Sequence, residues 1–301
     1  MNKSTLRLLL ALVLAALAAP AWAAGEAKMY VITDWELGNL MVPGFCSGKS
    51  IPDWDDMVDG WYNSIDDLGI FVKDGRQVNG TFTRSLLCDP DAIAGCTDNT
   101  RLDDADVAMI GLHGGDSGKH WRGSLRQDGT PSASADCRID AAEASGGEMF
   151  VGDTDLEYLH LSSCHSMDDD NLSNTRYWFQ DPVDSPGNGQ RLHMATGFHG
   201  IMWISSGRDD DYEDFGWGGH MLLGSIWMDE MYDSGVNGEY EQCPVAYSVG
   251  PSLDNCVHRL TTEGYMNLDP TLQADPTSIN YWCVQYYDGC DPKNESPFSL
   301  P

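Results

Sequence analysis

Short apolar runs alternate along the chain with longer segments in which apolar residues recur every three or four positions. The apolar runs have the length of buried β-strands and lie at Met29–Thr33, Ile70–Val72, Val107–Leu112, Leu156–Ser162, Arg191–Thr196 and Gly200–Ser205. The segments with helical spacing are Asp53–Leu68 and Phe215–Tyr232. Because strands alternate with helices, the pattern predicts an α/β fold with a mostly parallel sheet and helices outside it.

Two of the expected strands end in residues that are able to carry chemistry. The run Val107–Leu112 leads into His113-Gly114-Gly115-Asp116, and Leu156–Ser162 leads into Cys164, which follows His113 by 51 residues (164 − 113). In open α/β sheets the carboxyl ends of the strands face the ligand crevice. If the two strands are neighbours, His113 and Cys164 meet there, as a thiol nucleophile and its base require.

The segment Gly114–Gly152 between these two strands is rich in glycine and too long for a simple connection. A hairpin or a short helix is expected around Ile139–Ala144. The segment is interpreted as a lid, a propeptide-like inhibitor or a decoration of the fold, and the sequence does not choose among these three. Within the second strand, His160 is predicted to be a core histidine.

The first residues have the pattern of a secretory signal. Lys3 and Arg7 form a positive region, Leu8–Ala18 is apolar, and Ala21–Ala23 offers a small-x-small cleavage site. The apolar run is too short for a comfortable membrane span. A signal peptide over residues 1–23 is therefore expected, with a secreted or periplasmic chain that has no stable membrane insertion.

The remaining 278 residues or so (301 − 23) suffice for one large domain. A single domain over residues 24–301 is predicted, with a core at 24–240 and a disulfide-clipped extension at 241–301. The formal net charge of −30 becomes −32 once Lys3 and Arg7 are removed. So acidic a surface argues against nucleic acid and anionic membranes as partners, because both would be repelled.

Nine cysteines in an exported chain indicate disulfides with one thiol left over. Three local pairs flank polar loops and are expected to form clips: Cys88 with Cys96, Cys243 with Cys256, and Cys283 with Cys290. Cys46 and Cys137 remain for a long-range bridge. This leaves Cys164, which alone follows an apolar strand, as the free thiol.

Two blocks of the sequence resemble the caspase-like cysteine peptidases, which include gingipains, legumains and separase-type proteins. They are ADVAMIGLHGGD (Ala105–Asp116) and DLEYLHLSSCHS (Asp155–Ser166). The chain is more similar still to a family of secreted bacterial proteins with that arrangement, through Gly60-Trp61-Tyr62 and Gly197-Phe198-His199. The resemblance covers Met29–Tyr232. It implies a three-layer, caspase-like sheet flanked by helices, with long disulfide-clipped loops.

The resemblance also implies roles for the residues at the two strand ends. Cys164 becomes the nucleophile, His113 the general base and acid, and the N–H groups of Gly114 and Cys164 the oxyanion hole. A thiol titrates above neutrality unless its surroundings stabilise the thiolate, so a base beside it is physically required. The expected activity is acyl transfer from a peptide or protein substrate through a thioester, with no required cofactor.

Two other classes of function stay open, a metal-dependent hydrolase and a non-catalytic secreted binding protein of the same fold. The acidic run that follows Cys164 disfavours a thiolate and motivates the metal alternative, with zinc or calcium as the ion. The candidate metal ligands are Asp116, His165, Asp168, His199 and His220. For the substrate site, Asp209 and Asp211 form an acidic wall that favours Arg or Lys at the cleaved position, and Trp203 an apolar one.

Overall fold

The structure is a computed structural model of the whole chain. It describes residues 24–35, 46, 48–116, 120–126, 137–141, 147–168, 177–179, 191–232, 242–266, 272, 274–276, 278–287 and 290. The predicted signal peptide, residues 1–23, lies outside the described residues.

A seven-stranded sheet forms the centre of the molecule, with the strand order β10-β9-β8-β7-β3-β1-β2. Its strands are β1 (Gly25–Val31), β2 (Phe71–Val78), β3 (Val107–Gly111), β7 (Tyr158–Ser162), β8 (Met194–His199), β9 (Cys243–Gly250) and β10 (Tyr281–Gln285). From β2 to β8 all neighbours are parallel, whereas β9 is antiparallel to both β8 and β10. The predicted α/β class with a mostly parallel sheet is therefore confirmed.

The central strands are buried along their whole length, which explains their continuous apolar sequences. The prediction of two short strands around Gly197-Phe198-His199 is wrong, because β8 runs through these residues and Gly200–Ser205 is a loop. Gly197 suits the strand because a Cβ there would collide with the Ser166 hydroxyl on the turn after β7. Close packing, and not a strand break, accounts for this glycine.

The α-helices with defined bounds in the described residues are α2 (Asp53–Ser64), α4 (Asp209–Gly218), α5 (Leu223–Tyr232) and α6 (Leu253–Thr262). The single helix predicted at Phe215–Tyr232 is wrong, because the chain breaks between α4 and α5. Gly219 caps α4 and approaches Tyr265 so closely that a Cβ would lie 2.8 Å from its ring. The close packing leaves no room for a side chain at the position where α4 ends.

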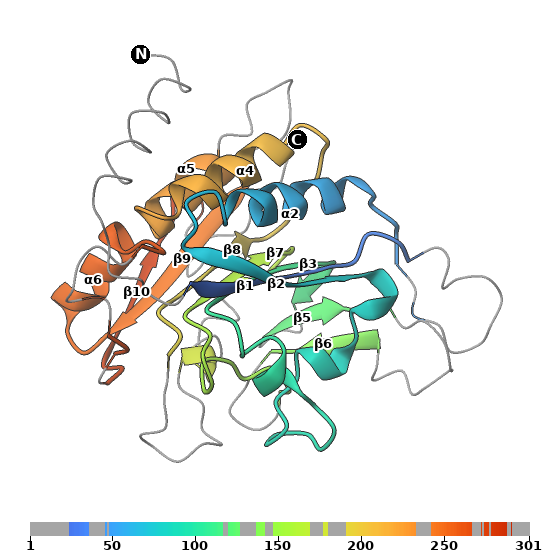
Figure 1. Cartoon of the computed structure of the whole chain (residues 1–301), viewed down its shortest axis with the longest axis horizontal. Helices are drawn as coiled ribbons and strands as arrows, with labels where there is room; N and C mark the ends of the chain where they lie inside the picture. The colour runs from blue at the N-terminus through green and yellow to red at the C-terminus, as the bar shows by residue number, and fades with distance from the viewer. Residues whose placement is uncertain are drawn as a thin grey trace.

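Figure 1 shows how the layers are arranged around the large sheet. Helices α2, α4 and α5 lie along one side of it, and β5 and β6 lie on the other. The second side carries a small antiparallel sheet of β4 (Gly114–Asp116), β5 (Trp121–Ser124) and β6 (Arg138–Asp140). Short 3-10 helices occur at Asn79–Thr81, Arg84–Leu86 and Asp98–Thr100. The described parts of the Gly114–Gly152 segment thus include this small sheet.

The disulfides confirm two predicted pairs and correct two others. Cys88–Cys96 and Cys46–Cys137 form as predicted, and Cys164 is free. The predicted clips in the last part of the chain are wrong, because the bridges are Cys243–Cys290 and Cys256–Cys283. The antiparallel pairing of β9 with β10 is the reason, since it sets Cys283 opposite Ser248, whose hydroxyl donates to Cys256 O.

Four disulfides are typical of proteins that fold outside the cell or in the periplasm. No helix in the described part of the chain combines the length and apolar character needed to cross a bilayer. The predicted extension over residues 241–301 supplies β9 and β10 to the large sheet.

Candidate active site

The sheet has a topological switch point between β1 and β3. The chain adds β2 on one side of β1 and then returns to add β3 on the other side. At such a switch point the carboxyl ends of the strands leave a crevice. His113 follows β3 there, and Cys164 follows the neighbouring β7. The two strands are parallel and in register, with Gly111 opposite Ser162. The prediction that these strands lie side by side is confirmed.

The ring of His113 is held by two tryptophans and one carbonyl. Its centroid lies 4.6 Å from that of Trp35 and 5.4 Å from that of Trp54. Its Nε2 lies 2.7 Å from the carbonyl oxygen of Lys49. Because a carbonyl only accepts, Nε2 carries the hydrogen in this bond, and in the neutral ring Nδ1 keeps the lone pair. His113 is therefore set in the tautomer in which Nδ1 is the proton acceptor.

Gly114 is in direct contact with the turn that holds Cys164. A Cβ at position 114 would lie 2.5 Å from Trp121 Nε1 and closer still to Cys164 O and Ser163 Oγ. Next to the antiparallel pairing of β4 with β5, Ser124 N donates a hydrogen bond to His113 O at 2.7 Å. Hydrogen-bonded and non-hydrogen-bonded pairs alternate along an antiparallel ladder, so the N–H of Gly114 is directed away from β5.

Cys164 is the only cysteine of the chain outside a disulfide. The residue is partly buried, and its Sγ accepts a hydrogen bond from Met202 N at 3.4 Å and lies 3.6 Å from Met202 O. Burial, with a smaller contribution from the charge of Asp168, raises the pKa of the thiol above its ordinary value. The sulfur is thus protonated at neutral pH, and a base must remove the proton before it can attack. No hydrogen bond between the His113 ring and Sγ occurs among the described contacts.

The end of β7 is fixed by side-chain hydrogen bonds from three elements. Ser162 Oγ accepts from Trp54 Nε1 of α2 at 2.9 Å and is 2.7 Å from the Tyr212 hydroxyl of α4. Ser163 Oγ accepts from Trp121 Nε1 of β5 at 3.1 Å. These bonds place the peptide before Cys164 with little freedom, which a nucleophile on a turn requires.

The carboxylate of Asp168 has three nitrogen hydrogen-bond partners around this turn. Its carboxylate lies 2.6 Å from His165 Nδ1 and 3.1 Å from His199 Nδ1, and it accepts from Gly200 N at 2.6 Å. Burial alone would raise the pKa of Asp168, but these hydrogen bonds outweigh it and hold the pKa below the ordinary range. Three predicted metal ligands do come together here, with both carboxylate oxygens already accepting N–H groups.

Of the other two predicted metal ligands, His220 lies apart from this cluster. The ring of His220 packs against Phe71 and Tyr265, and burial lowers its pKa to about 4. Asp116 belongs to β4, and its side chain lies outside the described residues.

A family model described as "Domain of unknown function (DUF6345)" matches residues 87–282, a span that holds both His113 and Cys164. The chain belongs to the DUF6345 family. The matched span runs from the loop before β3 into β10, so Trp35, Lys49 and Trp54, which hold the His113 ring, precede it. No curated protein and no solved structure matches the chain.

Within the DUF6345 span, the predicted substrate residues lie on the segment that follows β8. Trp203 comes directly after Met202, and its N–H donates to Gln242 Oε1 at 2.9 Å. Asp209 and Asp211 lie in the first turn of α4. Carboxylates are stabilised there by the helix dipole, so the helix start is one reason for these acids. Their role toward a substrate stays a prediction.

Several groups around the strand ends were not predicted from the sequence. The carbonyl of Lys49 and the backbone of Met202 are main-chain groups, which leave no signal in residue identity. Trp54 lies in Asp53–Leu68, which is predicted only as a helix, and Trp35 follows the predicted strand Met29–Thr33. The aromatic environment of His113 therefore emerges only from the fold.

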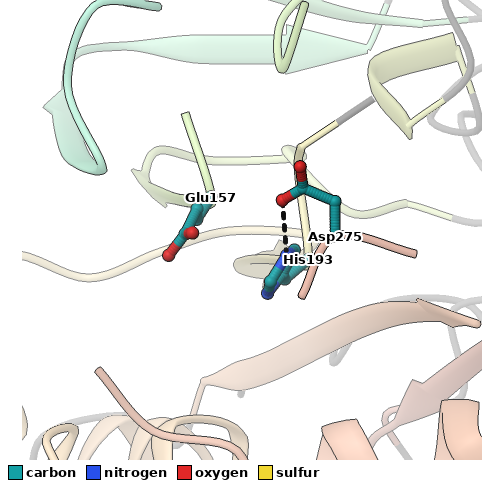
Figure 2. Close-up of side chains that lie close together, drawn as sticks. All are labelled: Glu157, His193 and Asp275. Carbon is teal, nitrogen blue, oxygen red and sulfur yellow. Dashed lines mark hydrogen bonds and ion pairs between the residues drawn. The ribbon is translucent and has the colours of Figure 1, made fainter. Parts of the chain in front are cut away.

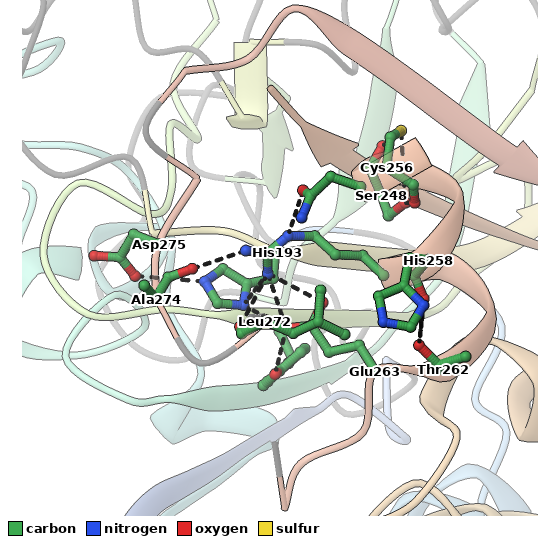
Figure 3. Close-up of polar contacts among 12 residues, drawn as sticks. His193, Ser248, Cys256, His258, Thr262, Glu263, Leu272, Ala274 and Asp275 are labelled. Carbon is green, nitrogen blue, oxygen red and sulfur yellow. Dashed lines mark hydrogen bonds and ion pairs between the residues drawn. The ribbon is translucent and has the colours of Figure 1, made fainter. Parts of the chain in front are cut away.

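A second polar cluster of the DUF6345 span lies at the opposite, amino-terminal edge of β7 and β8 (Figure 3). The fully buried His193 lies 2.6 Å from Glu263 Oε1 through Nδ1 and 3.4 Å from Asp275 Oδ1 through Nε2. Arg259 Nη1 lies 3.0 and 3.1 Å from the two Glu263 oxygens. Burial disfavours the charged ring, but the carboxylates, Glu263 first, outweigh burial and raise the pKa of His193 to about 9.

Proposed function

We propose that the chain is a cysteine peptidase-like hydrolase with Cys164 as nucleophile and His113 as general base and acid. The observation that carries the proposal is the Nε2–H bond from His113 to the carbonyl of Lys49. It leaves Nδ1 as the proton acceptor of a histidine that follows β3, the strand paired with β7, after which the free thiol of Cys164 comes. Contacts with the tilted ring of Trp35 and the edge-on ring of Trp54 restrain the imidazole.

The proposed chemistry has two stages. In the first, Nδ1 of His113 takes the proton of the Cys164 thiol while Sγ attacks a substrate carbonyl carbon. The N–H groups of Gly114 and Cys164 stabilise the resulting oxyanion, a contribution of about 3 kcal/mol for one such donor. The imidazolium then protonates the leaving amine, and a thioester remains on Sγ. In the second stage His113 deprotonates a water molecule, which hydrolyses the thioester and restores the thiol.

The raised pKa of Cys164 decides between two forms of this mechanism. A preformed thiolate–imidazolium pair requires a thiol pKa below that of the histidine, whereas burial raises the pKa of Cys164. The proposal is therefore concerted general-base catalysis, in which the proton moves as the sulfur attacks.

The proposed substrates are peptides with Arg or Lys at the cleaved position. This part of the proposal rests on the acids at the start of α4 and on the contact of α4 with β7 through Tyr212 and Ser162. Trp203 follows Met202, whose backbone contacts Sγ, and so is near enough in the chain to pack against a bound peptide.

The first experiment measures the reactivity of the thiol. The purified chain is treated with iodoacetamide at pH 7.5, and alkylation of Cys164 is followed by mass spectrometry. His113→Gln should slow alkylation about tenfold or more, because the base is gone. His258→Gln is the matched control and should leave the rate unchanged, since this histidine lies on α6, where its Nδ1 is 3.0 Å from the Thr262 hydroxyl.

The second experiment measures hydrolysis of fluorogenic peptide amides with Arg, Lys, Asp or Leu at the cleaved position. Turnover of the basic peptides, lost in both Cys164→Ala and His113→Gln, supports the proposal. A reactive thiol without hydrolysis of any peptide would favour a binding protein. Alkylation at the same rate in His113→Gln and in the unmodified chain would refute the pairing of the two residues.

A further inference from the structure

We propose that Glu157, His193 and Asp275 bind a divalent transition-metal ion such as Zn²⁺ at the edge of the sheet opposite Cys164. One ring nitrogen and one oxygen from each carboxylate lie within 4.8 Å of one another. Figure 2 shows the three side chains together. Glu157 precedes β7, His193 precedes β8, and Asp275 follows α6, so the site joins three distant parts of the chain.

The hydrogen bonds of His193 leave the correct nitrogen for a metal. Nδ1 lies 2.6 Å from Glu263 Oε1 and 2.9 Å from Arg259 Nη1. A carboxylate only accepts and a guanidinium only donates, so Nδ1 bonds one of the two. The shorter contact favours Nδ1–H donating to Glu263, since Arg259 also donates to Glu263 and to Ala274 O. A carboxylate that accepts the second N–H of a ligating histidine is common in metal sites.

The remaining nitrogen, Nε2, faces carboxylate oxygens at a spacing that fits a metal. Nε2 lies 3.4 Å from Asp275 Oδ1. A charge-assisted hydrogen bond between these groups would be about 2.7–2.9 Å long. Two ligands at about 2.1 Å from a tetrahedral Zn²⁺ are about 3.4 Å apart. Because a lone pair and an anionic oxygen repel, a cation between them is required, either a proton on the ring or a metal ion.

The scaffold holds the three ligands without the metal. His193 N donates to Glu157 O at 2.8 Å, which fixes the two residues beside each other. Arg259 donates to Leu272 O and Ala274 O, which positions the segment of Asp275. Arg191, the other guanidinium near Asp275, pairs with Asp155. His193 is fully buried, whereas the side chain of Asp275 is 44% exposed, so an ion can reach the site from solvent.

A second group of acids in the described residues gives a useful contrast. Glu26, Asp74 and Asp104 also offer three oxygens within 4.8 Å. There, however, the ammonium of Lys28 lies 3.1 Å from both aspartates and already supplies the positive charge. That group also lacks a histidine, and imidazole is the ligand that selects transition metals over calcium and magnesium. Of these two groups, the one at His193 alone has both the ligand type and the need for a cation.

The experiment measures metal binding by the full chain without an affinity tag. Cys164→Ser is used as the background, because a free thiol also binds zinc. After removal of metals with a chelator, ZnCl₂ and, separately, MnCl₂ are titrated by calorimetry at pH 7.5. We expect one zinc site per chain and a melting temperature that rises with zinc concentration.

Asp275→Asn and Glu157→Gln should each weaken zinc binding by at least about 100-fold, the upper end of the loss when an outer-shell partner is removed. Glu26→Gln, in the group already neutralised by Lys28, is the matched control and should bind zinc as the background does. Circular dichroism establishes that each variant is folded. Absence of zinc binding in the folded background, or equal binding in all variants, would overturn the proposal and leave a ring proton as the bridging charge.

Discussion

Gly114 provides the sharpest test of how the candidate site is built, because its neighbour is a matched control. In Gly114→Ala the new Cβ would overlap Cys164 O, Ser163 Oγ and Trp121 Nε1, all well inside normal contact distance. At Gly115 a Cβ would meet nothing within 4 Å. Cys164 O and Ser163 Oγ belong to the turn after β7, and Cys164 O is a backbone atom. The overlap can therefore be removed only if the turn itself moves.

Overpacking of this kind costs about 1–3 kcal/mol, and we expect a loss of about 3 kcal/mol in the free energy of unfolding because backbone is displaced. This is a large part of a typical stability of about 5–15 kcal/mol. It corresponds to a fall of about 6–9 °C in melting temperature. Gly115→Ala should change the free energy of unfolding by about 0.5 kcal/mol or less.

The assay is urea unfolding followed by circular dichroism, with the disulfides intact, together with the rate of alkylation of Cys164. Gly114→Ala should lower the unfolding midpoint and also change the alkylation rate, since the turn that carries the sulfur moves. Equal stability of the two alanine variants would refute the close approach of Gly114 to Cys164, and with it the proposed oxyanion hole.

Three further predictions follow from individual contacts. Trp54→Phe removes the hydrogen bond to Ser162 and should cost about 2 kcal/mol of unfolding free energy in urea. Burial raises the pKa of Asp98 to about 8, so folding takes up a proton between about pH 4 and 8. The free energy of unfolding therefore falls as the pH rises through this range. In urea unfolding, Asp98→Asn should be more stable than the unmodified chain at pH 8 and equal to it near pH 4. Asp168→Asn should destabilise the fold by about 2 kcal/mol and, by removing a negative charge, lower the pKa of Cys164 and speed its alkylation at pH 7.5.

The sequence predicts well the strands in which every residue is buried. Val107–Gly111 and Tyr158–Ser162 are buried on both faces, so unbroken apolar runs reveal them. His160, predicted as a core histidine, is fully buried between the hydroxyls of Thr196 and Tyr265, each 2.8 Å away. The adjacency of β3 and β7, and the freedom of Cys164 from disulfides, also followed from local patterns.

The errors arise where tertiary contacts override local signals. Gly197 reads as a strand break, yet the strand continues because Ser166 packs against that position. The two wrong disulfides came from pairing cysteines that are close in sequence, whereas strand pairing brings distant ones together. His193 gave no signal in sequence because its three carboxylate neighbours lie 36, 70 and 82 residues away along the chain (193 − 157, 263 − 193, 275 − 193).

The strand order has a consequence for how this architecture is made. Once β1, β2 and β3 have paired, each later strand of the large sheet adds to the same edge of the sheet. The order of addition is β7, β8, β9 and β10. No member has to be inserted between two that are already paired. The sheet can therefore grow in the order of the chain, and only the most recently added strand has an unpaired edge on that side.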